Sequence, residues 1–339
     1  MIFSTLRPLL FRLDPERAHR LTIAGLRLVP QGATRFDPRL AVTVAGLDFP
    51  SPIGLAAGFD KDAEVPDAML RLGFGSVEVG TITPLPQIGN PKPRLFRLTE
   101  DEAVINRMGF NNGGQPAARA RLAARRKMGI VGVNIGANKD ATDRIADYAD
   151  GVRDMADVAD YLAINISSPN TPGLRALQDA GALRELLAAI RDARKTGGPP
   201  VFLKVAPDLE PADIDDISRA AIDHGIDALI VANTTIGRPP LKSRHASETG
   251  GLSGAPLEQL ALDRLRDFRS ATGRQLPLIA AGGISSAQDA YARIRAGASL
   301  VQLYSALVYH GPGLAREITG GLLKCLEADG YAALSDAIG

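Results

Sequence analysis

Short apolar segments rich in β-branched residues recur along the chain. Most are continuous apolar runs rather than alternating ones, which is typical of parallel strands buried on both faces. Stretches with helical spacing of apolar residues separate many of them. The pattern predicts strands at 52–59, 76–81, 131–136, 161–168, 201–207, 228–234, 278–284 and 300–306, and helices at 62–72, 115–128, 142–159, 180–195, 211–224, 256–271 and 286–296.

This alternation predicts an α/β fold, a (β/α)8 TIM barrel with an N-terminal helical extension. A doubly wound open sheet is the alternative, because the reversal of strand order that defines it is not visible in a sequence. Two additions to a minimal barrel are predicted. Segments 94–98 and 103–107, inside an insertion at 82–114, pair as a hairpin above the barrel, and 41–49 forms a hairpin that closes its floor.

The first 28 residues follow a different pattern. A mostly apolar stretch, 1–13, precedes Asp14 and Pro15, which read as a helix cap and a first-turn proline, and helical spacing then continues to about Leu28. We interpret these residues as two short amphipathic basic helices that lie on a membrane face. A helical hairpin packed on the domain fits the pattern equally well. A secretory signal peptide or a transit peptide fits less well, because no small-residue cleavage site follows and acidic residues interrupt the segment.

The composition of the chain excludes several classes of partner and site. The chain has 339 residues, 45% hydrophobic and 23% charged, with 39 Lys and Arg against 38 Asp and Glu. This balance gives no reason to expect nucleic acid as a partner. The single cysteine, Cys325, cannot form an internal disulfide or a cysteine-based metal site, and it fits a reducing compartment. No apolar run reaches the roughly 18 residues of a spanning helix.

Polar residues gather where the predicted strands end. In such barrels the C-terminal ends of the strands carry the active site. Histidines and acid pairs are scarce there, which argues against a metal site and against glycosidase chemistry. Amides match donors and acceptors on a ring edge, so a flat heterocycle fits better. The residues at these ends are Ala57, Gly58, Phe59, Asp60, Lys61, Gly80, Thr81, Asn134, Asn165, Ser168, Lys204, Asn233, Thr234, Thr235, Gly282, Gly283, Tyr304 and Ser305.

Glycines and one lysine add detail to this site. The loops 280–286 and 303–307, with a second glycine cluster at 250–254, let backbone N–H groups approach a phosphate, although a tight strand-to-helix turn also explains the glycine pair. Lys204 lies inside a strand that is predicted to be buried, where an unpaired ammonium is costly. Either a bound anionic ring or a carboxylate of the chain would compensate its charge.

These motifs, taken together, resemble dihydroorotate dehydrogenase over nearly the whole chain and in order. The narrower resemblance is to the membrane-associated, quinone-dependent class (class 2). Helices precede the barrel, and Ser168 stands where the soluble classes have a cysteine base. The matching stretches are AAGFDKDAE (56–64), VEVGTITPLPQIGNPKPRLFRL (77–98), INRMGFNN (105–112), GVNIGANK (132–139), NISSPNTPGLR (165–175), LKVAPDL (203–209), ANTT (232–235), GGLSGAPL (250–257) and AGGI (281–284).

The resemblance implies one FMN per chain at the barrel mouth. Lys204 is expected to face the N1/O2 edge of the flavin, and Ala232 to contact it only through the backbone. The phosphate is expected at Gly254, Gly283, Tyr304 and Ser305. The residues expected around the ring are Ala57, Gly58, Phe59, Asp60, Lys61, Thr81, Asn134 and Asn165.

The resemblance also implies the substrate site and the chemistry. Ser168 is expected to take the C5 proton of dihydroorotate while hydride leaves C6 for flavin N5. A serine hydroxyl is a weak base, so it needs a relay, for which Thr171 is a candidate. Lys61 is expected to meet the substrate carboxylate. Asn106, Arg107, Asn165, Asn170, Asn233 and Thr234 are expected to bind the substrate, and Met108, Gly109 and Phe110 to cover it.

The N-terminal helices are expected to form an apolar tunnel from the membrane to the flavin. His19, Arg97 and Tyr304 are expected at its inner end. The resemblance thus divides the chain into a membrane and quinone-tunnel segment, 1–40, and an FMN-binding catalytic barrel, 41–339. It implies a peripheral protein on the cytoplasmic side of a bacterial cell membrane, with dihydroorotate and a membrane quinone as partners, and with neither nucleic acid nor metal.

Three alternatives remain open from the sequence. One is a soluble dihydroorotate dehydrogenase that uses fumarate or NAD, which the absent cysteine and the extra helices disfavour. Another is an FMN-dependent tRNA dihydrouridine synthase, which the near-zero net charge of +1 disfavours. The last is a barrel that senses a flavin or nucleotide without turnover.

Overall fold

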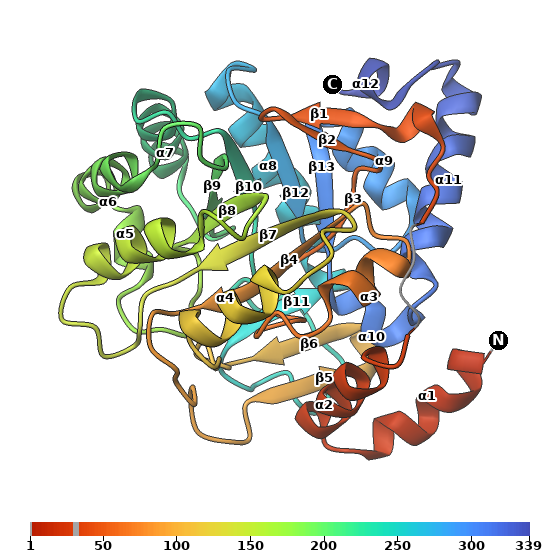
Figure 1. Cartoon of the computed structure of the whole chain (residues 1–339). Coiled ribbons are helices and arrows are strands. Elements are labelled where there is room, and N and C mark those ends of the chain that lie inside the picture. Colours follow the sequence, from red (N-terminus) through yellow and green to blue (C-terminus); the bar gives the residue numbers. More distant parts are fainter. Residues whose placement is uncertain (1, 30–33) are drawn as a thin grey trace.

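The computed structural model describes residues 2–29 and 34–339. Within them, eight parallel strands close a barrel, each pairing with the next in chain order and the last with the first. The open-sheet alternative is therefore excluded (Figure 1). The barrel strands are β3 (Ile53–Leu55), β4 (Ser76–Ile82), β7 (Ile130–Ile135), β8 (Tyr161–Asn165), β9 (Val201–Val205), β10 (Ala228–Val231), β12 (Leu278–Ala281) and β13 (Ala298–Leu303).

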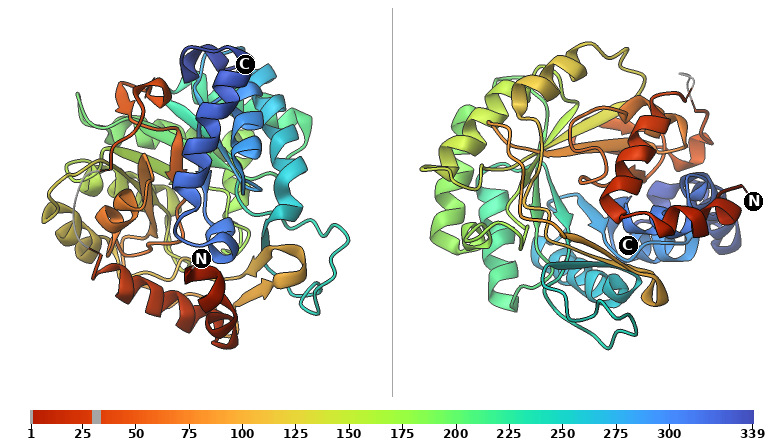
Figure 2. Two further views of the ribbon diagram at one scale, coloured as in Figure 1. Left: turned by 90° about the vertical axis from the view of Figure 1, so that its right-hand side faces the viewer. Right: turned by 90° about the horizontal axis from the view of Figure 1, so that it is seen from below.

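Helices surround the barrel and cover its outer face (Figure 2). Each predicted helix is present, so the helical spacing located them correctly. Local sequence also explains where several begin. For example, Ser286 and Asp289 form a reciprocal capping box at the start of α9. The helices that follow barrel strands are α3 (Pro66–Arg71), α4 (Gln115–Ala123), α5 (Arg144–Met155), α6 (Ala180–Ala193), α7 (Pro211–Asp223), α8 (Glu258–Thr272), α9 (Ala287–Arg295), α10 (Ser305–His310), α11 (Leu314–Asp329) and α12 (Leu334–Ala337).

An antiparallel hairpin, β1 (Val42–Val44) and β2 (Leu47–Phe49), closes the floor of the barrel as predicted. Phe49 is fully buried, and its ring lies 6.5 Å from that of Tyr161. Tyr161 in turn stacks on Phe202 with 4.6 Å between ring centroids. A Cβ at Gly132 would lie 2.1 Å from the Tyr161 ring, so the aromatic layer requires glycine there. Packed aromatic rings therefore fill this end of the barrel.

A small antiparallel sheet stands at the opposite end, above the barrel mouth. β5 (Leu95–Leu98) and β6 (Ala103–Asn106) form the predicted hairpin. The structure adds a third strand, β11 (Gly251–Gly254), which pairs with β6. The sequence analysis treated 250–254 only as a glycine-rich phosphate loop. The strand was missed because its pairing partner lies about 150 residues earlier in the chain, where local pattern carries no information about it.

Two helices at the N-terminus, α1 (Ile2–Arg12) and α2 (Pro15–Leu26), lie beside this small sheet at the mouth (Figures 1 and 2). Ion pairs tie α2 to the barrel domain. Arg94 reaches Glu16 at 2.6 Å, and Glu64 receives both Arg20 and Arg27. The hairpin is therefore fastened to the domain by charged side chains and also by apolar contacts, since Ile23 is buried in the main hydrophobic core and Leu26 packs against it.

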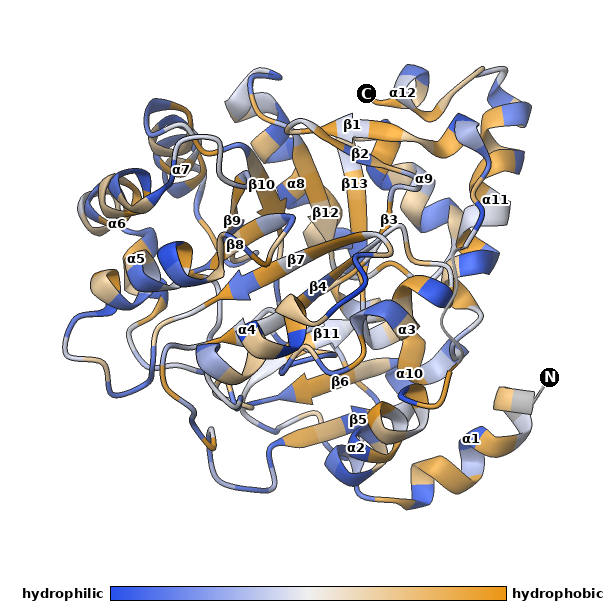
Figure 3. Cartoon of the chain, viewed as in Figure 1, coloured by the Kyte–Doolittle hydropathy of each residue, from blue (hydrophilic) through white to orange (hydrophobic). Residues whose placement is uncertain are grey.

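The outward faces of the same two helices carry exposed leucines: Leu6, Leu9, Leu13, Leu21 and Leu28. The apolar residues of α1 stand out in the hydropathy colouring of Figure 3. Among the described residues, no helix has the length and apolar character needed to cross a bilayer. The two sequence interpretations of this segment are thus compatible, because the hairpin packs on the domain and still leaves apolar residues in solvent.

Candidate active site

A cavity of about 520 Å³ lies at the C-terminal ends of the barrel strands, between the mouth and the helices α1 and α2. Its lining unites residues that are up to 309 positions apart in the chain, from Phe3 to Pro312. Most residues predicted for the site line it: His19, Ala57, Gly58, Phe59, Lys61, Thr81, Arg97, Asn106, Met108, Gly109, Phe110, Asn165, Ser168, Asn170, Lys204, Ala232, Asn233, Thr234, Gly254, Gly283, Tyr304 and Ser305.

Three of the residues predicted to bind FMN, substrate or quinone do not line this cavity, and neither do Gly80, Thr171 and Thr235. The carboxylate of Asp60 accepts the backbone N–H groups of Glu64 and Val65 at 2.8 Å, so it shapes the turn after β3. Arg107 turns toward Glu248, with 2.8 Å between the charged atoms. Asn134 is fully buried below the cavity surface.

Lys61 brings a cationic group to the cavity. Its ammonium donates to the carbonyl oxygen of Gly58 and has no salt bridge within 4 Å among the described residues. Burial lowers the pKa of Lys61 to about 8, because water is withdrawn from the charged form. A carboxylate arriving in the cavity would restore the lost stabilisation, so Lys61 can bind an anion.

The strand-to-loop turn after β8 carries Ser168. Its Oγ accepts the backbone N–H of Asn170 at 3.2 Å. The nearby hydroxyl of Thr171 is buried and has no hydrogen-bond partner among the described residues. Asn170 also donates from Nδ2 to Asn106 Oδ1 at 3.2 Å, which joins this loop to the small sheet.

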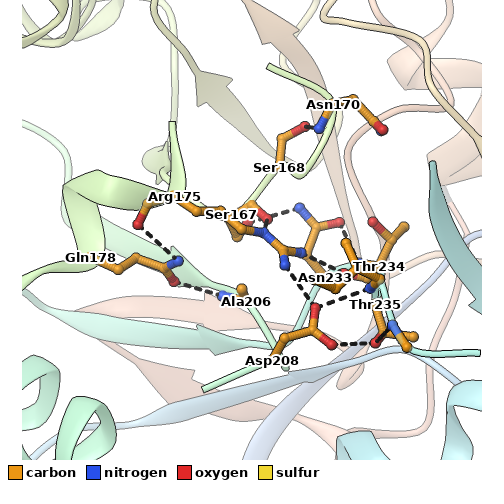
Figure 4. Close-up of polar contacts among 12 residues, drawn as sticks. Ser167, Ser168, Asn170, Arg175, Gln178, Ala206, Asp208, Asn233, Thr234 and Thr235 are labelled. Carbon is orange, nitrogen blue, oxygen red and sulfur yellow. Dashed lines mark hydrogen bonds and ion pairs between the residues drawn. The ribbon is translucent and has the colours of Figure 1, made fainter. Parts of the chain in front are cut away.

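Arg175 links the loop of Ser168 to the loop after β10 (Figure 4). Its guanidinium donates to the carbonyl oxygens of Ser167 at 2.9 Å and Thr234 at 3.0 Å, and it pairs with Asp208 at 2.7 Å. Asp208 also accepts the hydroxyl of Thr235. One ion pair therefore holds two loops whose residues line the same cavity.

Lys204 does have a carboxylate partner in the chain. Its Nζ lies 3.7 Å from Glu78 Oε1, and both side chains are almost completely buried. Lys204 nevertheless lines the cavity, so it presents a positive charge there. Lys204 therefore has a carboxylate partner in the chain and also faces the cavity.

Two glycines permit close packing at the far wall of the cavity. A Cβ at Gly254 would lie 2.3 Å from the carbonyl oxygen of Glu102, and one at Gly283 would lie 2.3 Å from the Cα of Glu258. The hydroxyl of Ser305 donates to that of Ser253 at 2.8 Å beside them. This wall is therefore made of closely packed backbone and hydroxyl groups, which suits a phosphate.

The opposite end of the cavity is apolar and lies under the N-terminal helices. Phe59 stands between His19 and Tyr304, with ring centroids 5.3 Å and 5.6 Å away. Burial lowers the pKa of His19 to about 4 and raises that of Tyr304 to about 12, so both are neutral near pH 7. Arg97 donates to the carbonyl oxygens of Leu10 and others at the end of α1.

The comparisons with known proteins agree with this geometry. The model of the family described as dihydroorotate dehydrogenase matches residues 39–326. The chain belongs to the dihydroorotate dehydrogenase family. Proteins named dihydroorotate dehydrogenase (quinone) from Erythrobacter litoralis and Sphingopyxis alaskensis are 64% and 62% identical, over 100% and 99% of this chain and 99% and 96% of their own lengths. The chain is a member of the quinone-dependent class.

Solved structures of the family superpose closely. A dihydroorotate dehydrogenase from Eimeria tenella in complex with ferulenol matches with a TM-score of 0.91 and 44% identity, over 96% of this chain and 95% of that one. The ligand-free form of the Eimeria protein matches with a TM-score of 0.92. Membership of this family implies a flavin cofactor.

Several residues that organise this dehydrogenase site are not among the predicted site residues. Glu78, Ser167, Arg175 and Asp208 each contact a residue that was predicted at the strand ends. A signal exists for Glu78, because a lone acid inside a continuous apolar strand needs a partner just as Lys204 does. The Arg175–Asp208 pair has no such signal, since Arg175 begins a short 3-10 helix and Asp208 lies in the loop after β9. Among the described residues, no group of three His, Cys, Asp or Glu side chains could hold a metal ion.

Proposed function

We propose that the cavity binds one FMN per chain with dihydroorotate against it, and that the residues around it carry out the oxidation to orotate. As a member of the quinone-dependent class, the enzyme acts in pyrimidine biosynthesis and passes electrons to a quinone. The observation that carries the proposal is that Ser168, Lys61 and Lys204 line one cavity whose other end reaches the N-terminal helices.

The residues present fit FMN. The backbone and hydroxyl wall of Gly254, Gly283 and Ser305, with Tyr304, would hold the phosphate, and Lys204 would meet the negative edge of the reduced ring. Ala57, Gly58, Phe59, Thr81, Asn165 and the backbone of Ala232 would surround the ring, with Asp60 and Asn134 supporting it from below. When bound, FMN would accept hydride from the substrate and deliver electrons to the quinone.

The substrate residues form a polar ring opposite. Lys61 would bind the carboxylate, and Asn106, Asn170, Asn233 and Thr234, with Asn165, would match the ring's donors and acceptors. Met108, Gly109 and Phe110 would cover it and exclude water. Arg107 would act from outside, by holding the covering segment to Glu248.

Ser168 would accept the C5 proton. Such a step requires an oriented hydroxyl and a path for the proton beyond it. The unpartnered hydroxyl of Thr171, three residues along the same loop, is the nearest candidate in the chain to receive that proton. The Arg175–Asp208 link would keep the loop in register with the substrate amides.

The quinone would enter beneath α1 and α2. The apolar end of the cavity, with His19, Arg97 and Tyr304, would receive its head group. We propose that residues 1–40 serve this purpose and that the exposed leucines of the hairpin rest on the cytoplasmic side of a bacterial cell membrane, as a peripheral attachment. The lone Cys325 fits a reducing compartment.

A flavin experiment tests the proposal. The purified protein should show a flavin spectrum, extractable as FMN, and anaerobic dihydroorotate should bleach it. A quinone should then restore the colour, whereas fumarate and NAD should not. An unbleached flavin would refute the assignment of the substrate, and reoxidation by fumarate or NAD would indicate the soluble-class alternative.

A further inference from the structure

A buried carboxylate lies directly below the proposed flavin site. Glu78, on β4, has no exposed surface, and its two oxygens accept from three groups. Asn134 Nδ2 donates to Oε1 at 2.8 Å, and Gln302 Nε2 and Tyr161 Oη donate to Oε2 at 2.8 and 3.1 Å. Lys204 completes the shell at 3.7 Å from Oε1. Three of these groups donate to the carboxylate oxygens and the fourth is a cation, so donors surround Glu78.

This acceptor fixes the orientation of the amide above it. Because Asn134 gives its NH2 group to Glu78, its carbonyl oxygen must face the other way. There it accepts from Thr81 Oγ1 at 2.5 Å and from Asn165 Nδ2 at 3.1 Å. Asn165 also donates to Thr81 Oγ1 at 2.9 Å. Since Asn165 uses its NH2 group in these bonds, its carbonyl oxygen faces the other way, toward Ser167.

The same order of donors and acceptors continues to the residues that are proposed to bind the substrate. Ser167 Oγ donates to Asn165 Oδ1 at 2.7 Å and accepts from Asn233 Nδ2 at 2.8 Å. Figure 4 shows this last link between Ser167 and Asn233. Asn233 Oδ1 then accepts the backbone N–H of Thr234 at 2.8 Å. An unbroken chain of hydrogen bonds thus runs from Glu78 through Asn134, Asn165 and Ser167 to Asn233.

We propose that Glu78 is a positioning residue that holds the donor–acceptor direction of this chain from its buried end, and so helps to fix which face of the Asn233 amide meets the substrate ring. The inference rests on the proposed substrate site. An amide can flip at little cost to its shape, but a flipped amide would present a donor to a donor of the substrate ring. The backbone N–H groups of Ser167 and Thr234 hold Asn165 Oδ1 and Asn233 Oδ1, whereas the amide of Asn134 is held by Glu78, which accepts on both oxygens.

The proposal is tested by measuring orotate binding to the oxidised holoenzyme, with the change in flavin absorbance as the signal. Glu78→Gln can turn its NH2 group toward Asn134, so Asn134 is no longer held from this end; reversal of Gln302, whose Oε1 has no partner among the described residues, is the competing response. We expect the dissociation constant of orotate to rise about threefold or more. The flavin midpoint potential should become more positive, since the negative charge beside Lys204 is gone.

Exchange of the acid and the amide between positions 78 and 302 should rescue orotate binding. A merely structural role of Glu78 would not give this rescue. In the double variant E78Q/Q302E, the carboxylate at position 302 accepts from the new amide, whose carbonyl oxygen can again accept from Asn134. Net charge and direction are both restored, so orotate affinity and midpoint potential should return toward the wild-type values. If the swap binds orotate no better than E78Q, the proposal is wrong.

A mutant cycle and a control complete the design. Ser167→Ala severs the chain, so E78Q should add little to the loss of orotate affinity in that background. Tyr161→Phe removes a donor from the same carboxylate outside the chain, and its orotate affinity should stay within about twofold of wild type. Wild-type affinity in E78Q, additive effects in the cycle, or an equal loss in Y161F would each refute the proposal. A wild-type holoenzyme that fails to bind orotate would instead refute the proposed function.

Discussion

Individual side chains in this site have their chemistry set by burial more than by residue type. Lys61 loses water and its pKa falls to about 8, while His19 falls to about 4 and Tyr304 rises to about 12. Desolvation is the leading cause in each case. Among the described residues that line the cavity, Lys61 is thus a cation without a carboxylate partner at the proposed substrate end, and His19 and Tyr304 are neutral rings at the proposed quinone end.

Removal of the Ser168 hydroxyl should stop proton abstraction without emptying the site. We expect Ser168→Ala to slow anaerobic flavin reduction by dihydroorotate about 100- to 10,000-fold, the usual contribution of a general base. Stopped-flow absorbance measures the rate. Flavin content and orotate affinity serve as controls and should be unchanged. A loss of less than about threefold would show that another group takes the proton.

Orotate affinity should depend on the charge of Lys61. The ammonium is charged below its pKa of about 8 and is lost above it, so binding of an anion should weaken as the pH rises through that value. Binding of the carboxylate favours the charged form, so the complex should titrate above the free enzyme. A titration of orotate between pH 6 and 9 should therefore show level affinity, then a decline toward tenfold per pH unit.

Lys61→Met provides the control for this pH dependence. The variant should bind orotate weakly at every pH, with no decline above pH 8. His19 and Tyr304, with pKa values near 4 and 12, do not titrate in this window. Level wild-type affinity up to pH 9 would contradict the assignment of Lys61.

At the scale of elements, loops from different strands are held together by a few charged links. Arg175 pairs with Asp208 in the loop after β9 and donates to Thr234 in the loop after β10, and Arg97 joins β5 to the end of α1. Both links use backbone carbonyls as acceptors, so they fix the position of a loop regardless of its side chains. Such links transmit geometry between elements that share no sheet pairing.

The Arg175–Asp208 link should affect catalysis as a unit. Arg175→Met or Asp208→Asn should each lower kcat/KM about 10- to 100-fold, because buried donors or acceptors lose their partner (about 1.5–3 kcal/mol). The double variant should be little worse than the more severe single one. Asp150→Asn breaks an exposed pair with Arg153 and should change kcat/KM less than twofold. Additive single effects would show that the pair does not act together.

Arg97 should separate the two half-reactions. Arg97→Met removes the donors that hold the carbonyl oxygens of Leu10 and Phe11, so α1 loses its fastening over the cavity. We expect reoxidation by a soluble short-chain quinone to slow roughly tenfold. Reduction by dihydroorotate should be unchanged, since that end of the cavity is untouched. Arg12→Met, on the exposed side of α1, is the matched control and should leave both rates unchanged.

At the scale of the whole molecule, the two ends of the barrel have opposite characters. The floor is closed by β1, β2 and stacked aromatic rings, while the mouth carries the cavity, the small sheet and the helices with exposed leucines (Figures 1 and 3). In the proposed orientation the mouth end faces the membrane, and the cavity opens toward the phase in which a quinone dissolves.

Vesicle binding should follow the exposed leucines of the hairpin. The triple variant L9S/L21S/L28S removes side chains that are 57%, 58% and 84% exposed. Burial of such side chains contributes about 1.5–3 kcal/mol each, so partition to anionic vesicles should weaken at least about 100-fold. Sedimentation with phosphatidylglycerol-containing vesicles measures this. Met128→Ser, just before β7 at the floor end, should have no effect; equal binding by the triple variant would contradict this orientation.

The pattern of residues along the chain is enough to predict the strands, the helices and the residues that gather at the barrel mouth. Continuous apolar strands separated by amphipathic helices admit few architectures, and parallel strands place their C-terminal residues on one edge. That is why Lys61, Asn165, Ser168 and Lys204, far apart in the chain, were expected in one mouth, where the structure indeed places them. Short apolar segments close together in the chain likewise predicted both hairpins.

Only the tertiary structure decided which side chains face the cavity and which support it. Asn134 and Arg107 belong to predicted motifs, yet one lies beneath the cavity and the other turns toward Glu248. Glu78 and β11 acquire their roles from partners distant in the chain. The physical reason is that hydrogen-bond direction and burial depend on what packs against a residue, and the sequence near the residue does not contain its neighbours in space.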